Sequence, residues 1–474
     1  MLDSIFRLPD AIGTGGGLSL NPEDCMHRLT STVVAGALLA LPPAIAAQQP
    51  RPIPYEMYTL ENGLRVILSE DHSSQVVEID LWYGVGSRNE RPGRTGFAHL
   101  FEHMMFQGSA HVKKAEHFQL VERAGGTENG STHDDYTNYF ETLPSNRLNL
   151  GLWLEADRMR SLAVTDSTFH NQRQAVKEER RLRIENQPYA SAIVEELPRV
   201  NDSANCFGYS HPGIGSMADL DAATTADVKA FFAQYYVPNN ATLAIVGDFE
   251  PAEAKRLVAS YFGDIPKGTT PQAVSCQKTY NSGERVKHLR DPKATLPASV
   301  RVYRAPEYES PDTPALELLA AILGQGESSR LNVKLAREAK AAITVQALHN
   351  PFGARQGPGA FITLAIANQG VKIDSLDALV RGQVADIVRD GVTAMELAKA
   401  KNSYRAGVIE ERQRVHNLAE ALQLANRFLG SPAAVNTDFE RYSRVSVDDI
   451  KRVAQTYLRP DNSLVLLVSS EGGQ

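Results

Sequence analysis

Residues 226–246, ADVKAFFAQYYVPNNATLAIV, and residues 448–468, DDIKRVAQTYLRPDNSLVLLV, are two copies of one pattern. Each copy predicts a helix, a turn built on Pro and Asn, and a strand of aliphatic residues. The matching positions are Asp227 and Asp449, Lys229 and Lys451, Tyr235 and Tyr457, Pro238 and Pro460, and Asn240 and Asn462. Because the repeat divides the chain into near-equal halves, it predicts a duplicated domain.

The segments before the first copy predict further strands and a helix. Residues 57–69 form two short apolar runs around Asn62-Gly63, a dipeptide typical of tight hairpin turns. Residues 76–85 are rich in β-formers and predict another strand, and residues 96–106 predict a helix. Strands mixed with segregated helices favour an α+β fold with two duplicated domains, each a sheet packed with helices.

Length and composition set the domain organisation. The chain has 474 residues, which suits two domains of about 200 residues each. Residues 266–297 mix Pro, Gly, Lys and Ser without periodicity, so we expect them to link a first domain over 48–265 to a second over 298–474. The net charge of −7 gives no general footprint for nucleic acid, and no nucleic-acid partner is expected.

Residues 1–47 predict an N-terminal extension that contains a signal peptide. A positive start at residues 26–28 precedes an apolar run at 33–41 and small residues in an A-x-A pattern at 44–46. Together these features predict a periplasmic or secreted protein. The apolar run is shorter than the about 20 residues that span a bilayer, so no transmembrane segment is expected in the mature chain. An N-terminal anchor that is never cut is the alternative.

Three cysteines, Cys25, Cys206 and Cys276, occur in the chain, and no two of them form a CxxC pair. A thiolate zinc site is therefore not expected. Cys206 and Cys276 can form a disulfide in an oxidising compartment, or they can be isolated buried thiols. The sequence leaves both alternatives open.

Residues 99–103, HLFEH, indicate a metal site. On a helix of 3.6 residues per turn, His99 and His103 share one face and Glu102 lies beside them. Two imidazoles at this spacing can bind one metal ion, with the carboxylate close to a bound water. Apolar neighbours on nearly every side predict a buried helix, where an unpaired carboxylate is costly. A metal ion explains that burial, and the alternative is a core histidine pair hydrogen-bonded to Glu102.

A catalytic zinc usually takes three protein ligands, so a third is expected from another element. Residues 169–183 predict a helix whose inward stripe is Phe169, Gln172, Val176, Glu179 and Leu182. Glu179 lies on this apolar face, whereas Glu178 is rotated about 100° away from it. We therefore expect Glu179 to be the third ligand. Without the histidine pair, a solvated glutamate would be the expected alternative.

The motifs together resemble the pitrilysin and insulinase-like zinc peptidases, especially the bacterial branch related to the mitochondrial processing peptidase. In that family an inverted H-x-x-E-H motif is followed downstream by a ligand Glu in a V-x-x-E-like segment, which residues 175–180 match. The resemblance covers roughly residues 55–470. It implies one zinc ion, held by His99, His103 and Glu179, with Glu102 as the base.

The same resemblance implies where a peptide binds. Each half is expected to contain an antiparallel sheet, and substrate peptides are expected to add to an exposed sheet edge. Residues 125–130, GGTENG, and 135–139, DYTNY, look like the family's substrate-strand segment. Asn129, Gly130 and Ser131 are then the expected substrate-binding residues. Without the resemblance, Gly125-Gly126 would predict an ordinary turn.

Two positions depart from the family pattern. Gln172 stands where a second Glu often supports the metal ligands, so this position adds no negative charge. In the second half, active members usually carry an Arg and a Tyr in an R-x6-Y arrangement, and these positions are Ala336 and Ile343 here. Losing an oxyanion donor typically lowers a rate by about 10²–10³. The resemblance therefore implies the zinc-holding subunit of a two-chain enzyme, with a homologous partner supplying Arg and Tyr.

We therefore expect a zinc metalloendopeptidase that acts on short or unfolded peptides. One alternative is a non-catalytic peptide-binding subunit that keeps its metal for structural reasons. The complete ligand set and the adjacent base argue against that alternative, and the missing Arg and Tyr argue for it. A metal-dependent hydrolase of another substrate ranks below both.

Overall fold

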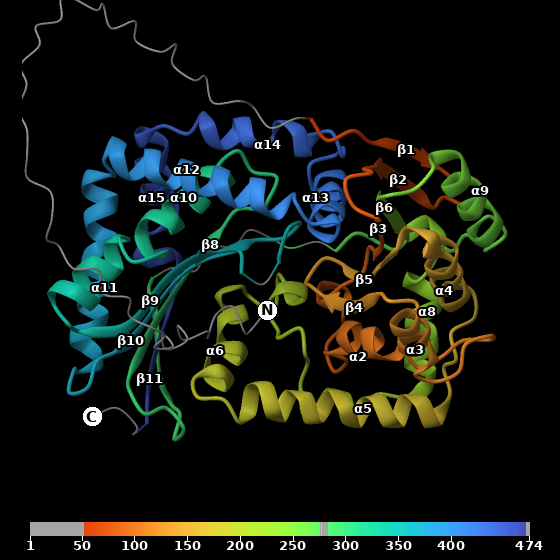
Figure 1. Cartoon of the computed structure of the whole chain (residues 1–474). Coiled ribbons are helices and arrows are strands. Elements are labelled where there is room, and N and C mark those ends of the chain that lie inside the picture. The colour runs from red at the N-terminus through yellow and green to blue at the C-terminus, as the bar shows by residue number, and fades with distance from the viewer. Residues whose placement is uncertain (1–51, 275, 277–282, 352, 471–474) are drawn as a thin grey trace, which may run out of the picture. The chain divides into compact units, whose positions relative to one another are not determined.

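The computed structural model describes residues 52–470 except 275, 277–282 and 352 (Figure 1). The predicted signal peptide, within residues 1–47, lies outside the described residues. Among the described residues, no helix is both long enough and apolar enough to cross a membrane.

The described chain builds two sheets (Figure 1). The first has six strands in the order β1 (Glu56–Thr59), β2 (Arg65–Glu70), β6 (Ala241–Gly247), β3 (Val76–Tyr83), β5 (Thr137–Pro144) and β4 (Thr127–Thr132). The second has five strands in the order β7 (Arg285–Arg290), β11 (Ser463–Ser469), β8 (Ala298–Ala305), β10 (Gly359–Ala367) and β9 (Ala342–His349). Neighbouring strands are antiparallel except β2 with β6 and β7 with β11, which are parallel.

The predicted repeat is present in both sheets. The first copy folds as α8 (Thr225–Tyr235) followed by β6, and the second folds as α15 (Val447–Tyr457) followed by β11. Both β6 and β11 have one parallel and one antiparallel neighbour, so the two sheets share a topology. The expected α+β fold of two similar sheets packed with helices is confirmed. The resemblance implied antiparallel sheets, but each sheet contains one parallel pair. The helix before β6 or β11 lets the chain return in the same direction as β2 or β7.

The expected linker contains a strand. β7 falls within residues 266–297 and pairs with β11 in the second sheet. Its burial alternates between half-buried and exposed, so the sequence around it lacks the apolar run that marks a central strand. The boundaries of the two domains stay a prediction.

Helices cover both sheets. In the first half they are α2 (Phe97–Met104), α3 (Glu116–Arg123), α4 (Leu148–Ser161), α5 (Asp166–Arg180), α6 (Ala190–Glu196), α7 (Met217–Ala222), α8 and α9 (Pro251–Phe262). In the second half they are α10 (Thr313–Gly324), α11 (Ile373–Asp390), α12 (Ala394–Glu411), α13 (Val415–Phe428), α14 (Ala434–Ser443) and α15. Each sheet and its helices enclose an apolar core.

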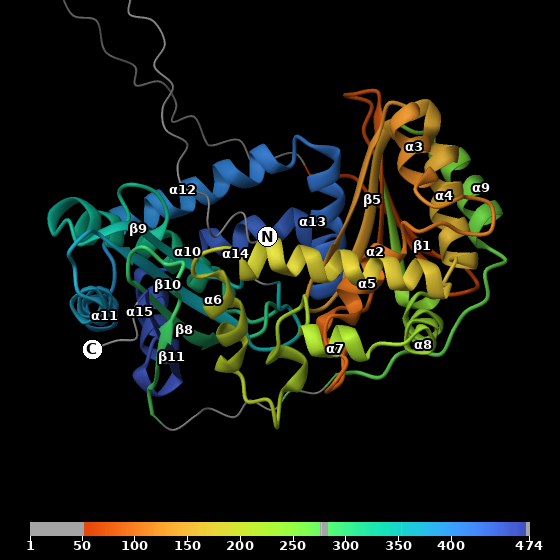
Figure 2. The ribbon, with the colours of Figure 1, turned by 90° about the horizontal axis from the view of Figure 1, so that it is seen from below.

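Each half also sends a helical segment across to the sheet of the other half. α13 lies against β3 and β6 of the first sheet, on the face opposite α4 and α9 (Figure 2). The Gln423 amide of α13 donates to the backbone carbonyls of Asp80 and Thr242, at 3.0 and 2.9 Å. In return, α6 contacts β11 of the second sheet. The two halves are therefore joined by packing as well as by the connecting chain.

Candidate active site

The helix α2 begins at a position fixed by its backbone and by a buried acid. Gly96 has a φ of 85°, and a Cβ there would lie 2.7 Å from the carbonyl oxygen of Ile214, so only glycine fits. The Glu90 carboxylate accepts the N–H groups of Gly96 and Ala98, both at 2.8 Å. These bonds satisfy donors that the first turn leaves free. These contacts fix the start of α2, and with it the positions of His99 and His103 on the same helix.

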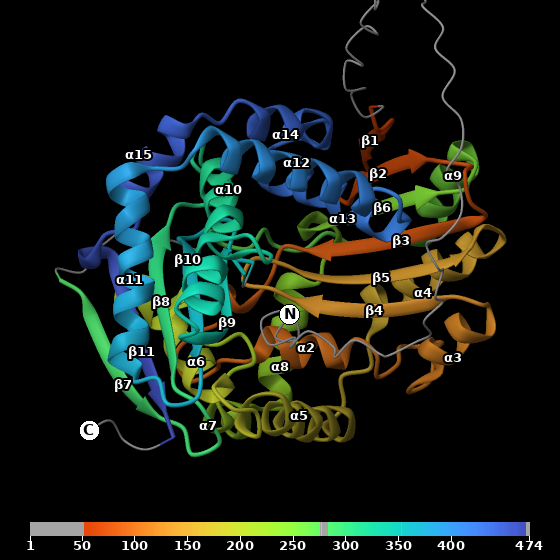
Figure 3. The same cartoon turned by 60° about the vertical axis from the view of Figure 1, so that its left-hand side comes forward.

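The three expected metal ligands meet between α2 and α5, and α2 itself lies between β4 and α5 (Figure 3). The Nε2 atom of His103 is 3.1 Å from Oε2 of Glu179, and Nε2 of His99 is 3.5 Å from the same oxygen. The two imidazole rings stand edge to face, with centroids 4.8 Å apart. Two imidazole nitrogens and one carboxylate oxygen thus converge on one point, and the role of these residues as metal ligands stays a prediction.

Glu102 lies beside this point. Its ligand atom and those of His99 and His103 all lie within 4.8 Å of one another. Its Oε2 accepts a hydrogen bond of 2.6 Å from the hydroxyl of Thr132 at the end of β4. The Glu102 carboxylate is therefore held in one orientation, next to the imidazole nitrogens of His99 and His103.

The protonation states of His99 and Glu179 suit a cation. Burial lowers the pKa of His99, which favours the neutral imidazole that binds metal. Burial by itself would lower the pKa of His103, but the hydrogen bond with Glu179 and the charge of Glu102 raise it. Burial would raise the pKa of Glu179, yet its hydrogen bond with His103 and the charges of His99 and Arg183 lower it to about 2. Glu179 is therefore anionic at neutral pH.

The chemistry of the donor set supports the fit to a metal. The Nε2 atoms of His99 and His103 both lie within 3.5 Å of Oε2 of Glu179. Neutral imidazole with a carboxylate is the ligand chemistry that zinc prefers. The residues present therefore fit a zinc ion bound by His99, His103 and Glu179.

The strand β4 is the edge of its sheet and runs past Glu102. A Cβ placed on Gly130 would lie 3.2 Å from Cγ of Glu102 and 3.2 Å from Cδ1 of Tyr139, so the glycine brings this backbone close to the base. Asn129 is exposed. The Ser131 hydroxyl instead donates to Oδ1 of Asn138 at 2.6 Å, which directs it away from Glu102.

Comparison with known proteins identifies the family. The family model described as Insulinase (Peptidase family M16) matches residues 65–199, and the one described as Peptidase M16 inactive domain matches residues 222–404. This chain belongs to peptidase family M16. As a member of M16 it is a metallopeptidase, a hydrolase of peptide bonds.

Relatives of this M16 chain are named as proteases. It is 29% identical to the zinc protease PqqE of Helicobacter pylori over 87% of this chain and 92% of that protein. It is 22% identical to the probable mitochondrial-processing peptidase subunit beta of Arabidopsis thaliana, over 84% of this chain and 75% of that protein. The crystal structure of a protease from Helicobacter pylori superposes with a TM-score of 0.82 at 27% identity, covering 88% of this chain and all of that one.

Around the M16 site, one predicted neighbour is in place and another is not. Gln172 is buried on α5 and hydrogen-bonds with His103. Leu182 was expected on the same inward stripe, but its exposed fraction is 54%. The prediction for Leu182 is wrong because α5 widens into a π-helical turn at Arg181–Glu185, which breaks the 3.6-residue period.

Two residues that shape this site, Glu90 and Thr132, were not predicted from the sequence. Thr132 follows Gly130 by two positions on a strand, so alternation places both residues on one face, and in the structure that face meets Glu102. Glu90 precedes α2 by several residues, and no helical or strand period connects it to the histidines. Its role depends on the turn that brings it back to the helix start.

The positions that usually hold Arg and Tyr lie at the edge of the second sheet. Ala336 is in a π-helical segment, Asn332–Glu338, and Ile343 is on β9, the last strand of that sheet. The exposed fraction of Ile343 is 52%. An aliphatic side chain here donates no hydrogen bond to a reacting carbonyl.

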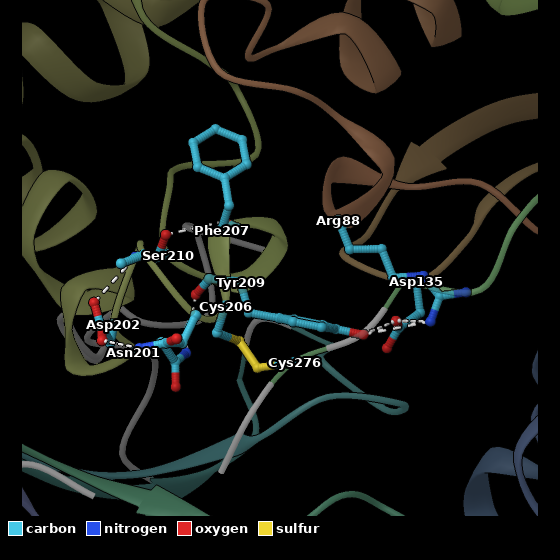
Figure 4. The surroundings of a disulfide bond; sticks show 11 residues. Arg88, Asp135, Asn201, Asp202, Cys206, Phe207, Tyr209, Ser210 and Cys276 are labelled. Atoms are coloured by element: carbon cyan, nitrogen blue, oxygen red, sulfur yellow. Dashed lines mark hydrogen bonds and ion pairs between the residues drawn. A yellow bond between two sulfur atoms is a disulfide. The ribbon is translucent and has the colours of Figure 1, made fainter. Parts of the chain in front are cut away.

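Cys206 and Cys276 form a disulfide, which decides between the two alternatives left open by the sequence (Figure 4). Close to it, the hydroxyl of Tyr209 donates to Asp135 at 2.6 Å, and Arg88 pairs with the same carboxylate at 2.8 Å. The disulfide therefore joins the segment that connects the two halves, through Cys276, to the segment around Cys206 and Tyr209. Through Tyr209, that second segment contacts Asp135, which follows β4.

Proposed function

We propose that this M16 chain is a zinc-dependent endopeptidase that hydrolyses short or unfolded peptides. The observation that supports this most strongly is the convergence of His99 and His103 on Glu179, with Glu102 beside them. An ordinary core histidine pair would not require a carboxylate from a second helix as well as an adjacent Glu in the motif. The arrangement therefore supports a metal site with an adjacent base.

In this proposal His99, His103 and Glu179 hold the zinc ion. When bound, zinc polarises the scissile carbonyl and lowers the pKa of water. Gln172 hydrogen-bonds with His103 and keeps that ring oriented, although it adds no charge to the site.

Glu102 acts as the proton carrier. Its carboxylate accepts a proton from the water that attacks the carbonyl carbon, and it returns that proton to the leaving amine nitrogen. The C–O bond forms first, and the C–N bond breaks once the proton reaches the nitrogen, so the oxygen of the water ends in the new carboxyl group and the transferred proton ends on the new amine. The Thr132 hydroxyl holds Glu102 in the orientation that this transfer requires.

The substrate peptide adds to β4 as a further strand. Backbone hydrogen bonds bind a peptide with little regard to its side chains, which suits varied unfolded segments. Asn129 and Ser131 flank Gly130, and Gly130 lets the peptide backbone pass close to Glu102 because it has no side chain.

We further propose that a homologous partner completes the enzyme. Ala336 and Ile343 provide neither a guanidinium nor a phenol, so the developing oxyanion lacks two donors that a partner would supply. The disulfide between Cys206 and Cys276 supports an oxidising compartment such as the periplasm.

The decisive test is a pair of matched substitutions on the purified chain. Glu102→Gln should keep zinc and abolish cleavage of a fluorogenic peptide, since an amide does not accept the proton. Glu179→Gln should lose zinc, whereas Glu178→Gln, whose side chain is 57% exposed on the same helix, should keep it. Cleavage by Glu102→Gln near the wild-type rate would remove Glu102 as the base.

A second candidate, a peptide-binding subunit without activity of its own, is favoured by Ala336 and Ile343. Cleavage is therefore measured for the lone chain and again with a related chain that carries the Arg and Tyr. Activity that depends on Glu102 of this chain in the mixture supports the endopeptidase. Activity that survives Glu102→Gln in the mixture supports the non-catalytic subunit.

A further inference from the structure

A second group of ligating side chains lies beneath β4, apart from the zinc site. It consists of His117 on α3, Glu128 on β4 and Glu141 on β5. The Nε2 atom of His117 is 2.6 Å from Oε1 of Glu141 and 3.1 Å from Oε2 of Glu128. One imidazole nitrogen and two carboxylate oxygens therefore converge, each from a different element.

These side chains are shielded from water but not satisfied. Side-chain exposure is 4% for His117, 2% for Glu128 and 0% for Glu141. Neither carboxylate oxygen of Glu128 has a hydrogen-bond partner among the described residues, and Oε2 of Glu141 has none either. A buried carboxylate without partners is costly, so the cluster calls for a positive ligand.

The surrounding charges do not supply that ligand. Arg158 is the nearby guanidinium, and it is hydrogen-bonded to Glu155 at 2.9 Å through Nε. Its guanidinium carbon also lies 4.6 Å from the centre of the Tyr139 ring. One guanidinium therefore faces the three carboxylates of Glu128, Glu141 and Glu155, which leaves a net charge of −2 when all are ionised and His117 is neutral.

The arrangement shares one feature with the proposed zinc site. There too an imidazole nitrogen stands 3.1 Å from a carboxylate oxygen contributed by another element. Ligands about 2.0–2.2 Å from a tetrahedral ion are themselves roughly 3.3–3.5 Å apart. The ligand atoms of His117 and Glu128, now 3.1 Å apart, then have to separate by about 0.2–0.4 Å, and those of His117 and Glu141, now 2.6 Å apart, by about 0.7–0.9 Å. Flexible glutamate side chains accommodate such a change.

We propose that His117, Glu128 and Glu141 bind a second divalent transition-metal ion of the zinc class. The free oxygen of Glu141 is available as a fourth ligand atom. Because the cluster is closed to water, the ion has a structural role: it ties α3 and β5 to β4. That strand is the sheet edge on which a peptide is expected to add, so the ion stiffens the substrate platform without touching the substrate.

The test counts metal ions in the full chain, with the catalytic site disabled by His103→Ala and Glu179→Gln together. After loading with Zn²⁺ and removal of excess, the wild type should hold two ions per chain and this disabled chain one. Adding Glu128→Gln to the disabled chain should remove the remaining ion. Adding Glu122→Gln instead, an exposed glutamate on α3, should leave it in place.

A disabled chain that holds no zinc would overturn the proposal, as would equal zinc content in the Glu128→Gln and Glu122→Gln versions. Either outcome would mean that protons, rather than a metal ion, neutralise the carboxylates of Glu128 and Glu141. If Glu128→Gln does not fold, the disabled chain alone decides: its Tm must rise when Zn²⁺ is added, and an unchanged Tm refutes the site. Neither result depends on peptidase activity, so the proposed function is tested separately.

Discussion

Replacing Thr132 by Val should slow peptide hydrolysis without releasing zinc. Val has nearly the shape of Thr but lacks the hydroxyl that donates to Oε2 of Glu102 at 2.6 Å. Thr132 is half-buried, and its hydroxyl otherwise lies only near the carbonyl oxygen of Ala98, at 3.5 Å. The substitution therefore removes one contact to the base and leaves the ligands His99, His103 and Glu179 untouched.

The size of the effect follows from the kind of bond lost. A hydrogen bond to a charged group contributes about 1.5–3 kcal/mol. If all of it is needed in the transition state, kcat falls about 10- to 100-fold, since about 1.4 kcal/mol corresponds to a factor of ten. KM should change little, because Thr132 holds the base and the peptide adds along the β4 backbone.

The assay is cleavage of a fluorogenic peptide by the zinc-loaded chain, with its partner if the lone chain is too slow. Thr132→Ser is the matched control, because serine keeps the donating hydroxyl and should retain most of the activity. Zinc content and Tm are measured for both variants. A kcat for Thr132→Val within twofold of that for Thr132→Ser would refute the role of this bond.

Three further predictions concern stability. Burial raises the pKa of Glu420, at the contact between α13 and the first sheet, to about 7, so the ionised form of Glu420 lowers the free energy of unfolding as pH rises from 4.5 to 7. Glu420→Gln should therefore stabilise the protein at pH 8 by up to about 3 kcal/mol and only a little at pH 5, as measured by urea unfolding. The hydrogen bond from Arg330 lowers the pKa of Glu396 to about 2, so the contribution of this ion pair to stability is present above pH 4.5 and lost toward pH 2. Because the pair is partly exposed to solvent, Glu396→Gln should lower the free energy of unfolding by only about 1 kcal/mol at pH 7, and an equal loss at pH 2 would contradict this. Replacing Cys206 and Cys276 by Ser should cost about 2–4 kcal/mol, because the disulfide closes a long loop, and an unchanged denaturation midpoint would refute it.

The features that the sequence predicted well depend on local periodicity. A spacing of four residues places His99 and His103 on one helical face in any α-helix, so the motif required no knowledge of the fold. The repeat likewise identified α8 with β6 and α15 with β11, because helix, turn and strand each leave a local pattern. The position of Glu179 near the two histidines was predicted because it lies on the apolar face of its helix.

The features that it missed depend on contacts between distant segments. The bond from Thr132 to Glu102 requires β4 to pass α2 in one register, and no pattern in either segment specifies that register. His117, Glu128 and Glu141 come from three elements, each of which predicts an ordinary polar residue. The error at Leu182 has a different origin, because a π-helical turn adds a residue to one helical turn without a sequence signal.

The two halves share a topology, but the proposed metal ligands and base all lie in the first half. In the first half α2 follows β3 and carries the histidines, and in the second half α10 follows β8 with the sequence TPALELLAAILG, which contains no histidine. α10 is buried along almost its whole length, so it serves the core. The counterpart of β4 is β9, whose edge displays Ile343 instead of a hydrogen-bond donor.

We therefore infer that the second half supports the reaction by packing against the first half, and not through a side chain at the reacting carbonyl. Its α13 covers β3 and β6, where the Gln423 amide bonds to backbone of both strands, and this packing holds the sheet that ends in β4. A helix in this position can stabilise the substrate edge, but it brings no donor to the oxyanion. In the proposed enzyme the first half supplies the metal ligands and the base, and the second half supplies neither Arg nor Tyr, so we expect full activity to require donors from another chain.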